Sequence, residues 1–459
     1  MKLIYDIKDR PKFGQLLVFA VQQLLAIMAA TLVVPVIVGN GMSPAAALFG
    51  AGAGTLIYVL FTKASSPVFL GSSFAFLGSM AAAFAGGVSM QLGYVGLIMG
   101  AIFAGLVYVV IALIVKFAGV GWINKLMPAV VIGPTVAIIG LSLAGNAVGD
   151  LTKGSVVVEE VAVASPLIAV LCGLITLGVT MLCATFGKKF SRLIPFIIGI
   201  IAGYAAALIF TIIGNTAGVD ALKVLNTAPL AALAENGVTL KTFFSVPDFT
   251  FLTAAKGLKE INPSYVISIL VAYMPVAFVV FAEHIADHKN ISTIIERDLL
   301  KEPGLHRTLL GDGVGSMVGA IFGGCPNTTY GESIGCVAIT RNASVATIIT
   351  AAVGAILISF INPFVAFVNS IPSCVMGGVC MALYGFIAVS GLKMVQKVDL
   401  EQNNNLFVVS VILIAGIGGL TLTFGKVTIT SIACALILGI LTNVMLSGKK
   451  TEKVEKTEE

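Results

Sequence analysis

Charged side chains are scarce in this 459-residue chain. Asp, Glu, Lys and Arg make up 11% of it, apolar residues make up 58%, and the mean hydropathy is +1.04. Soluble globular domains carry about 25% charged residues, so this composition excludes that class and indicates a membrane protein. The net charge of +5 is better explained by membrane topology than by nucleic-acid binding.

Cysteine is also sparse. The seven cysteines form no C-x-x-C pair and lie in apolar segments, which argues against a disulfide framework and against a zinc site. The N-terminus lacks a short apolar core followed by a small-residue cleavage site, so we expect no cleaved signal peptide. Glycine, by contrast, is abundant at 50 residues, as expected where helices pack closely in lipid.

Apolar stretches long enough to cross a bilayer, at about 20 residues each, recur along the whole chain. If the N-terminus is cytoplasmic and the spans number fourteen, most of the 27 Lys and Arg residues fall on the cytoplasmic side, as the positive-inside rule requires. Both termini are then cytoplasmic. The expected spans are residues 14–38, 44–62, 68–86, 92–118, 122–145, 165–186, 194–217, 264–286, 307–323, 325–341, 343–362, 371–390, 405–422 and 427–446.

Two short matches suggest an internal repeat. Residues 127–133 (MPAVVIG) are similar to residues 371–377 (IPSCVMG), and residues 72–74 (SSF) are similar to residues 328–330 (TTY). Both pairs are seven spans apart, and an odd number of spans per repeat places the two halves in opposite orientation. The pattern therefore predicts a seven-plus-seven inverted repeat.

One polar stretch interrupts the tenth span. Residues 325–332 (CPNTTYGE) place an amide, two hydroxyls, a phenol and a carboxylate inside an apolar segment. Pro326 disfavours helix before it, and the sequence becomes helical from Glu332 onward. The pattern predicts a short extended piece followed by a half-helix, an arrangement that marks substrate sites in transporters. By the repeat, the third span is broken in the same way.

Four acids lie in or at the ends of spans, where a carboxylate is costly and is a functional candidate by default. Glu283 and Asp287 are four residues apart on one helix face, and in a low dielectric they would tend to share a proton. The alternatives are that span 8 ends near residue 284, leaving Asp287 solvated, and that Glu332 only caps a helix. We interpret Asp312 as a polar contact. The Gln22–Gln23 pair either joins helices or lines the site.

Histidines and aromatic residues add further candidates. His284 and His288 are four residues apart, but no third ligand is evident, so we expect no metal site. Phe74, Tyr330 and Tyr384 could stack on a planar ligand, although packing alone would also explain them. With no arginine in the middle of a span, an anion fits poorly, and a polar, uncharged, flat ligand fits best.

Several motifs resemble those of the nucleobase–cation symporters, also called nucleobase–ascorbate transporters, and most closely their bacterial uracil branch. They are residues 71–76 (GSSFAF), 282–284 (AEH), 303–307 (PGLHR), 326–332 (PNTTYGE), 338–341 (AITR), 375–379 (VMGGV) and 384–385 (YG). The resemblance implies an all-α polytopic membrane protein with fourteen spans in a seven-plus-seven repeat, and short strands and half-helices in spans 3 and 10. It implies a core domain (14–118 and 264–362), a gate domain (122–217 and 371–446), an extracytoplasmic loop (218–262) and a cytoplasmic tail (447–459).

The function implied by the resemblance is secondary-active uracil:proton symport, without a cofactor and without enzymatic activity. The protein would be a homodimer in the bacterial cytoplasmic membrane. Glu283 and Glu332 would bind the uracil ring together with the backbone of Phe74 and Gly331. The remaining implied site residues are Tyr330 and Tyr384, which would line the site, and Asp287 and Gln23, which would act with Glu283 in proton coupling.

This chain departs from the family pattern at two positions, because Gln23 and Asp287 stand where the uracil branch commonly has histidine. Sodium coupling is the alternative to proton coupling. The competing functions are a xanthine or other purine carrier of the same fold, an anion exchanger of this architecture, and an intramembrane hydrolase built on Asp287 and Asp312.

Overall fold

The protein is mostly helical in the computed structural model, which describes residues 3–119, 122, 128–158, 161–235, 237–424 and 427–447. The α-helices are α1 (Phe13–Val38), α2 (Pro44–Phe61), α3 (Leu77–Ala83), α4 (Met90–Ala118), α6 (Ala129–Ser142), α7 (Ala144–Leu151), α8 (Pro166–Phe186), α9 (Lys189–Leu193), α10 (Pro195–Ala217), α11 (Ala228–Ala231), α12 (Leu240–Phe243), α13 (Thr250–Gly257), α14 (Pro263–Ile295), α15 (Leu305–Gly323), α16 (Gly331–Thr340), α17 (Val345–Ile358), α18 (Asn362–Ser370), α19 (Ser373–Val395), α20 (Asn403–Ile417) and α21 (Ser431–Ser447). Shorter elements are β1 (Leu70–Ser72), η1 (Phe74–Phe76), β2 (Val157–Val158), β3 (Val161–Ala162), η2 (Asp220–Leu222), η3 (Leu258–Glu260), η4 (Leu300–Gly304), β4 (Asn327–Thr329), β5 (Leu422–Phe424) and β6 (Val427–Ile429).

Within the described residues, eight helices are long and apolar enough to cross a membrane, and four shorter apolar helices accompany them. This confirms a multi-pass, mostly helical membrane protein with few short strands; the count of fourteen spans and the repeat stay predictions. Residues 123–127, which include part of the expected fifth span and the start of its repeat motif, lie outside the described residues, as does the tail beyond residue 447.

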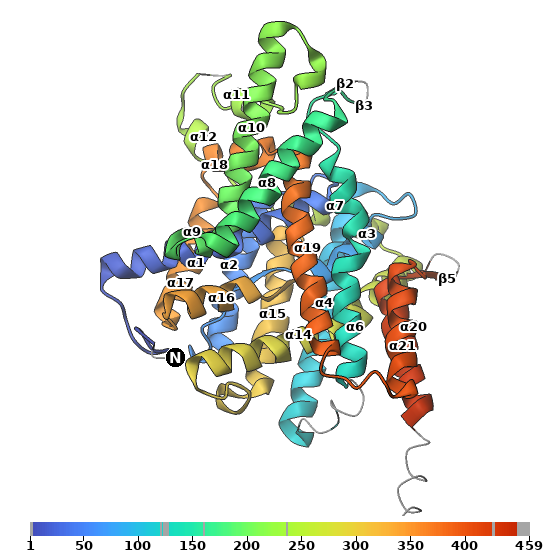
Figure 1. Ribbon diagram of the computed structural model, residues 1–459. Coiled ribbons are helices and arrows are strands. Elements are labelled where there is room, and N and C mark those ends of the chain that lie inside the picture. Colours follow the sequence, from blue (N-terminus) through green and yellow to red (C-terminus); the bar gives the residue numbers. More distant parts are fainter. Residues whose placement is uncertain are drawn as a thin grey trace, which may run out of the picture.

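The helices pack in two groups. In the first group α1, α2, α4, α14, α15 and α17 contact one another, and in the second group α6, α8, α10, α19, α20 and α21 do so. Figure 1 shows α20 and α21 side by side at the edge of the second group, with α6 next to them and α19 packed against α6. The two groups meet along α14, which also contacts α6 and α21, and along α1, which also contacts α10 and α19.

The closest packing in the first group depends on glycine. Helix α2 presents Gly50 and Gly54 to Gly315 and Gly319 of α15. A Cβ atom on Gly54 would lie 2.6 Å from the carbonyl oxygen of Gly315, so a larger residue there would push the two backbones apart. Small residues allow close van der Waals contact between helices in lipid, where no hydrophobic driving force acts between them.

Two broken segments cross at the centre of the first group. Strands β1 and β4 pair antiparallel, with Leu70 opposite Thr329 and Ser72 opposite Asn327. Each strand leads into a helical segment, β1 into η1 and α3, and β4 into α16. The expected breaks in spans 3 and 10, and the short strands within them, are therefore confirmed.

The backbone of the broken segments is paired inside the protein, as membrane depth requires. The Thr55 hydroxyl accepts from the Leu70 amide at 2.9 Å, the Ser73 amide donates to the Pro326 carbonyl at 2.9 Å, and the Tyr330 amide donates to the Phe69 carbonyl at 3.2 Å. These bonds let non-helical backbone persist in an apolar surrounding.

Helix α14 is longer than the expected eighth span. Helix α14 continues to Ile295, nine residues beyond the expected end at 286, so Asp287 lies within the helix and not in a solvated loop. His288, one residue later, is fully buried and its ring bonds to Tyr58, which explains why the polar run does not end the helix.

Candidate functional site

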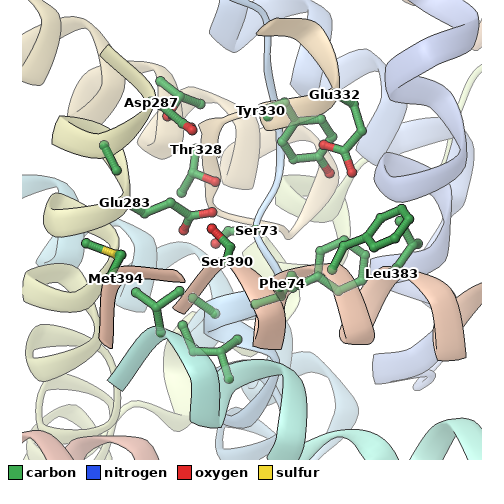
Figure 2. Close-up of a pocket in the computed structure, with 18 of the residues that line it drawn as sticks. Ser73, Phe74, Glu283, Asp287, Thr328, Tyr330, Glu332, Leu383, Ser390 and Met394 are labelled. Carbon is green, nitrogen blue, oxygen red and sulfur yellow. The ribbon is translucent and has the colours of Figure 1, made fainter. Parts of the chain in front are cut away.

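A cavity lined by several polar residues lies where the two helical groups meet. It has a volume of about 360 Å³, within the range typical of small-ligand sites. The first group contributes residues of α14, η1, β4 and the start of α16, and the second group contributes residues of α6, α10 and α19. Figure 2 shows this cavity with the polar residues of the first group facing α19.

The broken tenth segment forms one wall. Gly331 is the first residue of α16 and Glu332 the second, so the free amides and positive dipole end of this helix point toward the cavity. Open space surrounds the position where Gly331 would carry a Cβ atom. A ligand can therefore approach the backbone closely at Gly331.

Tyr330 fixes the crossing of the two broken segments. Its hydroxyl donates to the carbonyl oxygen of Ser72 at 2.6 Å. Its ring fills the space that a side chain on Gly71 would need, so glycine at 71 is required by the tyrosine at 330. Phe74, which begins the helical part of the third segment, lines the same cavity.

Three carboxyl groups face the cavity. Glu283 and Asp287 reach it from α14 and Glu332 reaches it from α16. Figure 2 shows Glu283 pointing toward Ser73 and Ser390, with Glu332 beside Tyr330. None of the described residues that line the cavity is a Lys or Arg. The site is therefore suited to accept hydrogen bonds or bind protons and poorly suited to hold an anion.

Asp287 is tied to the broken segment. The hydroxyl of Thr329, at the end of β4, donates to its Oδ2 atom at 2.7 Å. This bond joins α14 to β4 at the wall of the cavity. The alternative in which Asp287 is a solvated residue beyond its helix is wrong.

Several lining residues were not anticipated. On the side of α19 the wall is apolar apart from the hydroxyl of Ser390, with Leu383 and Met394 beside it. Ser73 adds a second hydroxyl from the other side. A serine in an apolar helix is a weak signal in sequence, because serines there more often join helices than line sites.

Two of the expected site residues lie outside this cavity. Gln23 of α1 is buried, and its side-chain amide donates to the hydroxyl of Ser333, which also accepts from the amide of Phe69 at 3.0 Å. Tyr384 lines a separate cavity, and its ring packs edge-on against Phe74, with 5.9 Å between centroids. Gln23 therefore holds the first turn of α16 through Ser333, outside the cavity. Tyr384 packs against Phe74, which does line the cavity.

The histidines of α14 lie on a different face of the helix from the cavity acids and bond to protein groups. His284 pairs through Nδ1 with Asp312 at 2.7 Å and through Nε2 with Thr308 at 3.0 Å. His288 pairs through Nε2 with Tyr58 at 2.7 Å and through Nδ1 with the His284 carbonyl at 2.8 Å. All four ring nitrogens are therefore occupied. Asp312 is the polar contact that the sequence predicted.

Comparison with known proteins matches residues 14–425 of this chain to the Permease family of xanthine and uracil permeases. The uracil permease of Bacillus subtilis is 38% identical, with 100% of this chain and 98% of that protein covered. The uracil permease of Bacillus caldolyticus is 39% identical over 98% and 96% of the two chains. That of Escherichia coli is 35% identical over 95% and 92%.

Solved structures share the fold at low identity. The transmembrane domain of a cyanobacterium bicarbonate transporter, BicA, aligns with a TM-score of 0.60 at 14% identity, covering 96% of this chain and 100% of that one. The murine anion transporter Slc26a9 in its inward-facing state aligns with a TM-score of 0.63 at 10% identity, covering 96% and 69%. These likenesses establish a membrane-transporter fold.

Proposed function

Because this chain belongs to the nucleobase–cation symporter family and is a transporter, not an enzyme, we propose that it carries uracil together with protons. The observation that carries the proposal is the cavity in which Glu283 and Glu332 are placed together against the exposed amide end of α16. Full-length relatives named uracil permeases support the choice of base.

In this proposal the two glutamates accept hydrogen bonds from the ring N–H groups of uracil. The backbone at Phe74 and Gly331 donates to its carbonyl oxygens, since helix starts carry free amide groups. Phe74 and Tyr330 pack against the uracil ring, and Tyr384 acts indirectly by packing against Phe74. A neutral heterocycle suits a site whose ionisable groups are all acids.

Proton coupling rests on the carboxyl groups. Glu283 and Asp287 lie together on α14 at a cavity whose described lining residues include no Lys or Arg, and carboxylates in such a place are costly unless they bind protons or are paired. We assign proton binding to these two residues. Gln23 contributes by holding Ser333, next to Glu332, in place.

Transport would follow from movement between the two helical groups. The first group corresponds to the proposed core domain and the second to the proposed gate domain, and the cavity lies between them. Rocking of one group against the other around a fixed site is how transporters of inverted-repeat architecture work. We also propose a homodimer in the cytoplasmic membrane, with both termini cytoplasmic.

The test is uptake of radiolabelled uracil into proteoliposomes that contain the full chain. Glu283→Ala and Glu332→Ala should each abolish uptake while the protein still inserts and purifies normally. Glu260→Ala is the matched control, because this glutamate lies outside the cavity and bonds to Ser89. Uptake at the unmodified rate by either cavity variant would contradict the site.

Competition by unlabelled bases separates uracil from purine carriers. Uracil in excess should suppress labelled uptake, whereas xanthine should not. The two solved structures compared above are anion carriers, but the cavity here is lined by three carboxyl groups, so bicarbonate should not compete either.

A further inference from the structure

The chain before α1 packs against the end of α16 that lies away from the cavity. Residues 4–9, which we call the N-terminal latch, run alongside residues 341–345, between α16 and the start of α17. Tyr5 forms a parallel β-bridge with Asn342. Ile7 is 4% exposed and belongs to the main apolar core. The latch is therefore a packed part of the fold.

Hydrogen bonds hold the latch against residues 341–345 along its length. Four of them run from the Ile4 amide to the Arg341 carbonyl at 2.8 Å, from the Ala343 amide to the Tyr5 carbonyl at 2.9 Å, from the Val345 amide to the Ile7 carbonyl at 3.0 Å, and from the Ser344 hydroxyl to the Asp9 carbonyl at 2.6 Å. Ala343 and Val345 are buried, so their amides would lose their partners if the latch came away. A buried amide without a partner costs free energy, and this cost keeps the latch docked.

The latch also contacts the end of α14. Asp6 forms an ion pair with Arg297, two residues beyond the end of α14 at Ile295. The other carboxylate oxygen of Asp6 accepts from the Ile7 amide at 2.7 Å, and the Asp6 amide donates to the carboxylate of Asp9 at 2.7 Å. These local bonds fix the direction of the Asp6 carboxylate toward Arg297.

The two helices that end at the latch are the ones that carry the cavity acids. Asp287 is eight residues from the end of α14, and Glu332 is eight residues from the end of α16, which places each about 12 Å along its helix from the latch. Helix α16 has only 10 residues, and so short a helix depends on packing for its stability. Its first turn is held by the bond between Gln23 and Ser333, and its last turn is held by the latch.

We propose that the latch positions the substrate site. By joining the ends of α14 and α16, it fixes Glu332 relative to Glu283 and Asp287, so that the three carboxyl groups face one ligand. Asp6 and Arg297 act through these helices and are positioning residues, since neither lines the cavity. This inference rests on the proposed carboxyl site for uracil.

The first test is hydrogen exchange of the purified full chain, followed by mass spectrometry. Asp6→Arg and Arg297→Asp each break the ion pair and bring like charges together, so amides of residues 331–345 should exchange about fivefold faster in either variant. The double variant with both substitutions restores opposite charges and should restore slow exchange. Asp220→Arg is the matched control, because it reverses one charge of an exposed ion pair with Lys223 beside α10. It should leave the exchange of residues 331–345 unchanged.

The second test separates positioning from a general loss of folded protein. In uracil uptake by proteoliposomes, each single charge reversal should raise the KM about fivefold and leave the maximal rate per inserted protein unchanged. The double variant should recover the KM of the unmodified protein. A lower maximal rate with an unchanged KM in the single variants would overturn the positioning role.

Two exchange results would also overturn the proposal. One is unchanged exchange of residues 331–345 in both single variants, and the other is a double variant that exchanges as fast as the single ones. Because hydrogen exchange needs no substrate, it decides on the latch even if the unmodified protein takes up no uracil, a result that would contradict only the proposed function.

Discussion

The hydrogen bond between Thr329 and Asp287 gives a prediction whose size follows from the structure. Thr329→Val keeps the shape of the side chain and removes the donor that bonds to Oδ2 of Asp287 at 2.7 Å. A hydrogen bond to a charged group contributes about 1.5–3 kcal/mol and one between neutral groups about 1 kcal/mol. Because Asp287 faces the cavity, water can partly replace the lost hydroxyl, and we expect a loss of about 1–2 kcal/mol in the free energy of unfolding.

Denaturant unfolding of the purified protein measures this loss. Thr135→Val is the matched control, because Thr135 is buried in α6 and its hydroxyl bonds only to the carbonyl of Val131 in its own helix. Such bonds contribute little, so the control should change the free energy by less than about 0.5 kcal/mol.

Repeating Thr329→Val in an Asp287→Asn background tests whether charge matters. Asn can still accept the hydrogen bond through its carbonyl oxygen. If Asp287 is ionised, the loss in the free energy of unfolding caused by Thr329→Val should therefore be smaller in this background and close to the value for neutral partners. A Thr329→Val loss no larger than that of the Thr135 control would refute the inference that this bond holds β4 against α14.

Three further substitutions test the walls of the cavity. The Gly331→Ala variant should fold normally, because open space surrounds the new methyl group. The methyl group would extend into the space of the ligand, so the KM for uracil should rise about tenfold, which corresponds to about 1.4 kcal/mol of binding free energy. An unchanged KM in uptake assays would count against ligand contact at Gly331. Gly71→Ala would place its methyl 2.9 Å from the Thr31 hydroxyl and within the Tyr330 ring, and should cost about 1–3 kcal/mol, seen as a lower Tm. Tyr330→Phe removes the hydroxyl that donates to the Ser72 carbonyl and should lower the free energy of unfolding, measured with denaturant, by about 1–3 kcal/mol. No loss would mean that this bond does not stabilise the contact between the two broken segments.

The broken segments were predictable from sequence because their signal is local. A proline followed by a run of polar residues and glycine, as at residues 326–332, cannot continue an apolar helix, and membrane depth tolerates such backbone only where protein or a cavity surrounds it. The pairing of β1 with β4 followed from the repeat, but its register did not. Which residue of residues 70–72 lies opposite which residue of residues 327–329 depends on how the whole first group packs.

Contacts between distant residues could not be predicted. His284 and Asp312 are 28 positions apart on different helices, and nothing in either segment identifies the partner. The Gln23–Ser333 bond spans 310 positions. The extension of α14 beyond the expected span was not predictable for a related reason, because the polar residues after Glu283 resemble a loop until their buried partners are known.

The resemblance to the family predicts the region in which Tyr384 lies but not the cavity that its side chain lines. The family pattern places it at the site, and the structure does bring it against Phe74. Packing between α6, α7 and α19 decides which cavity the Tyr384 side chain lines. Residues of these three helices line the neighbouring cavity together with Tyr384. Such rotations of a side chain are not encoded in a short motif.

In the proposed transport, a proton gradient moves a flat, uncharged base through the cavity of Glu283 and Glu332. The most direct measurement is uracil accumulation in proteoliposomes under an imposed inward proton gradient, compared with an imposed inward sodium gradient. Uracil should accumulate under the proton gradient, a protonophore should abolish this accumulation, and a sodium gradient alone should cause none. Accumulation driven by sodium and unaffected by the protonophore, or no uracil movement under either gradient, would contradict the proposed transport.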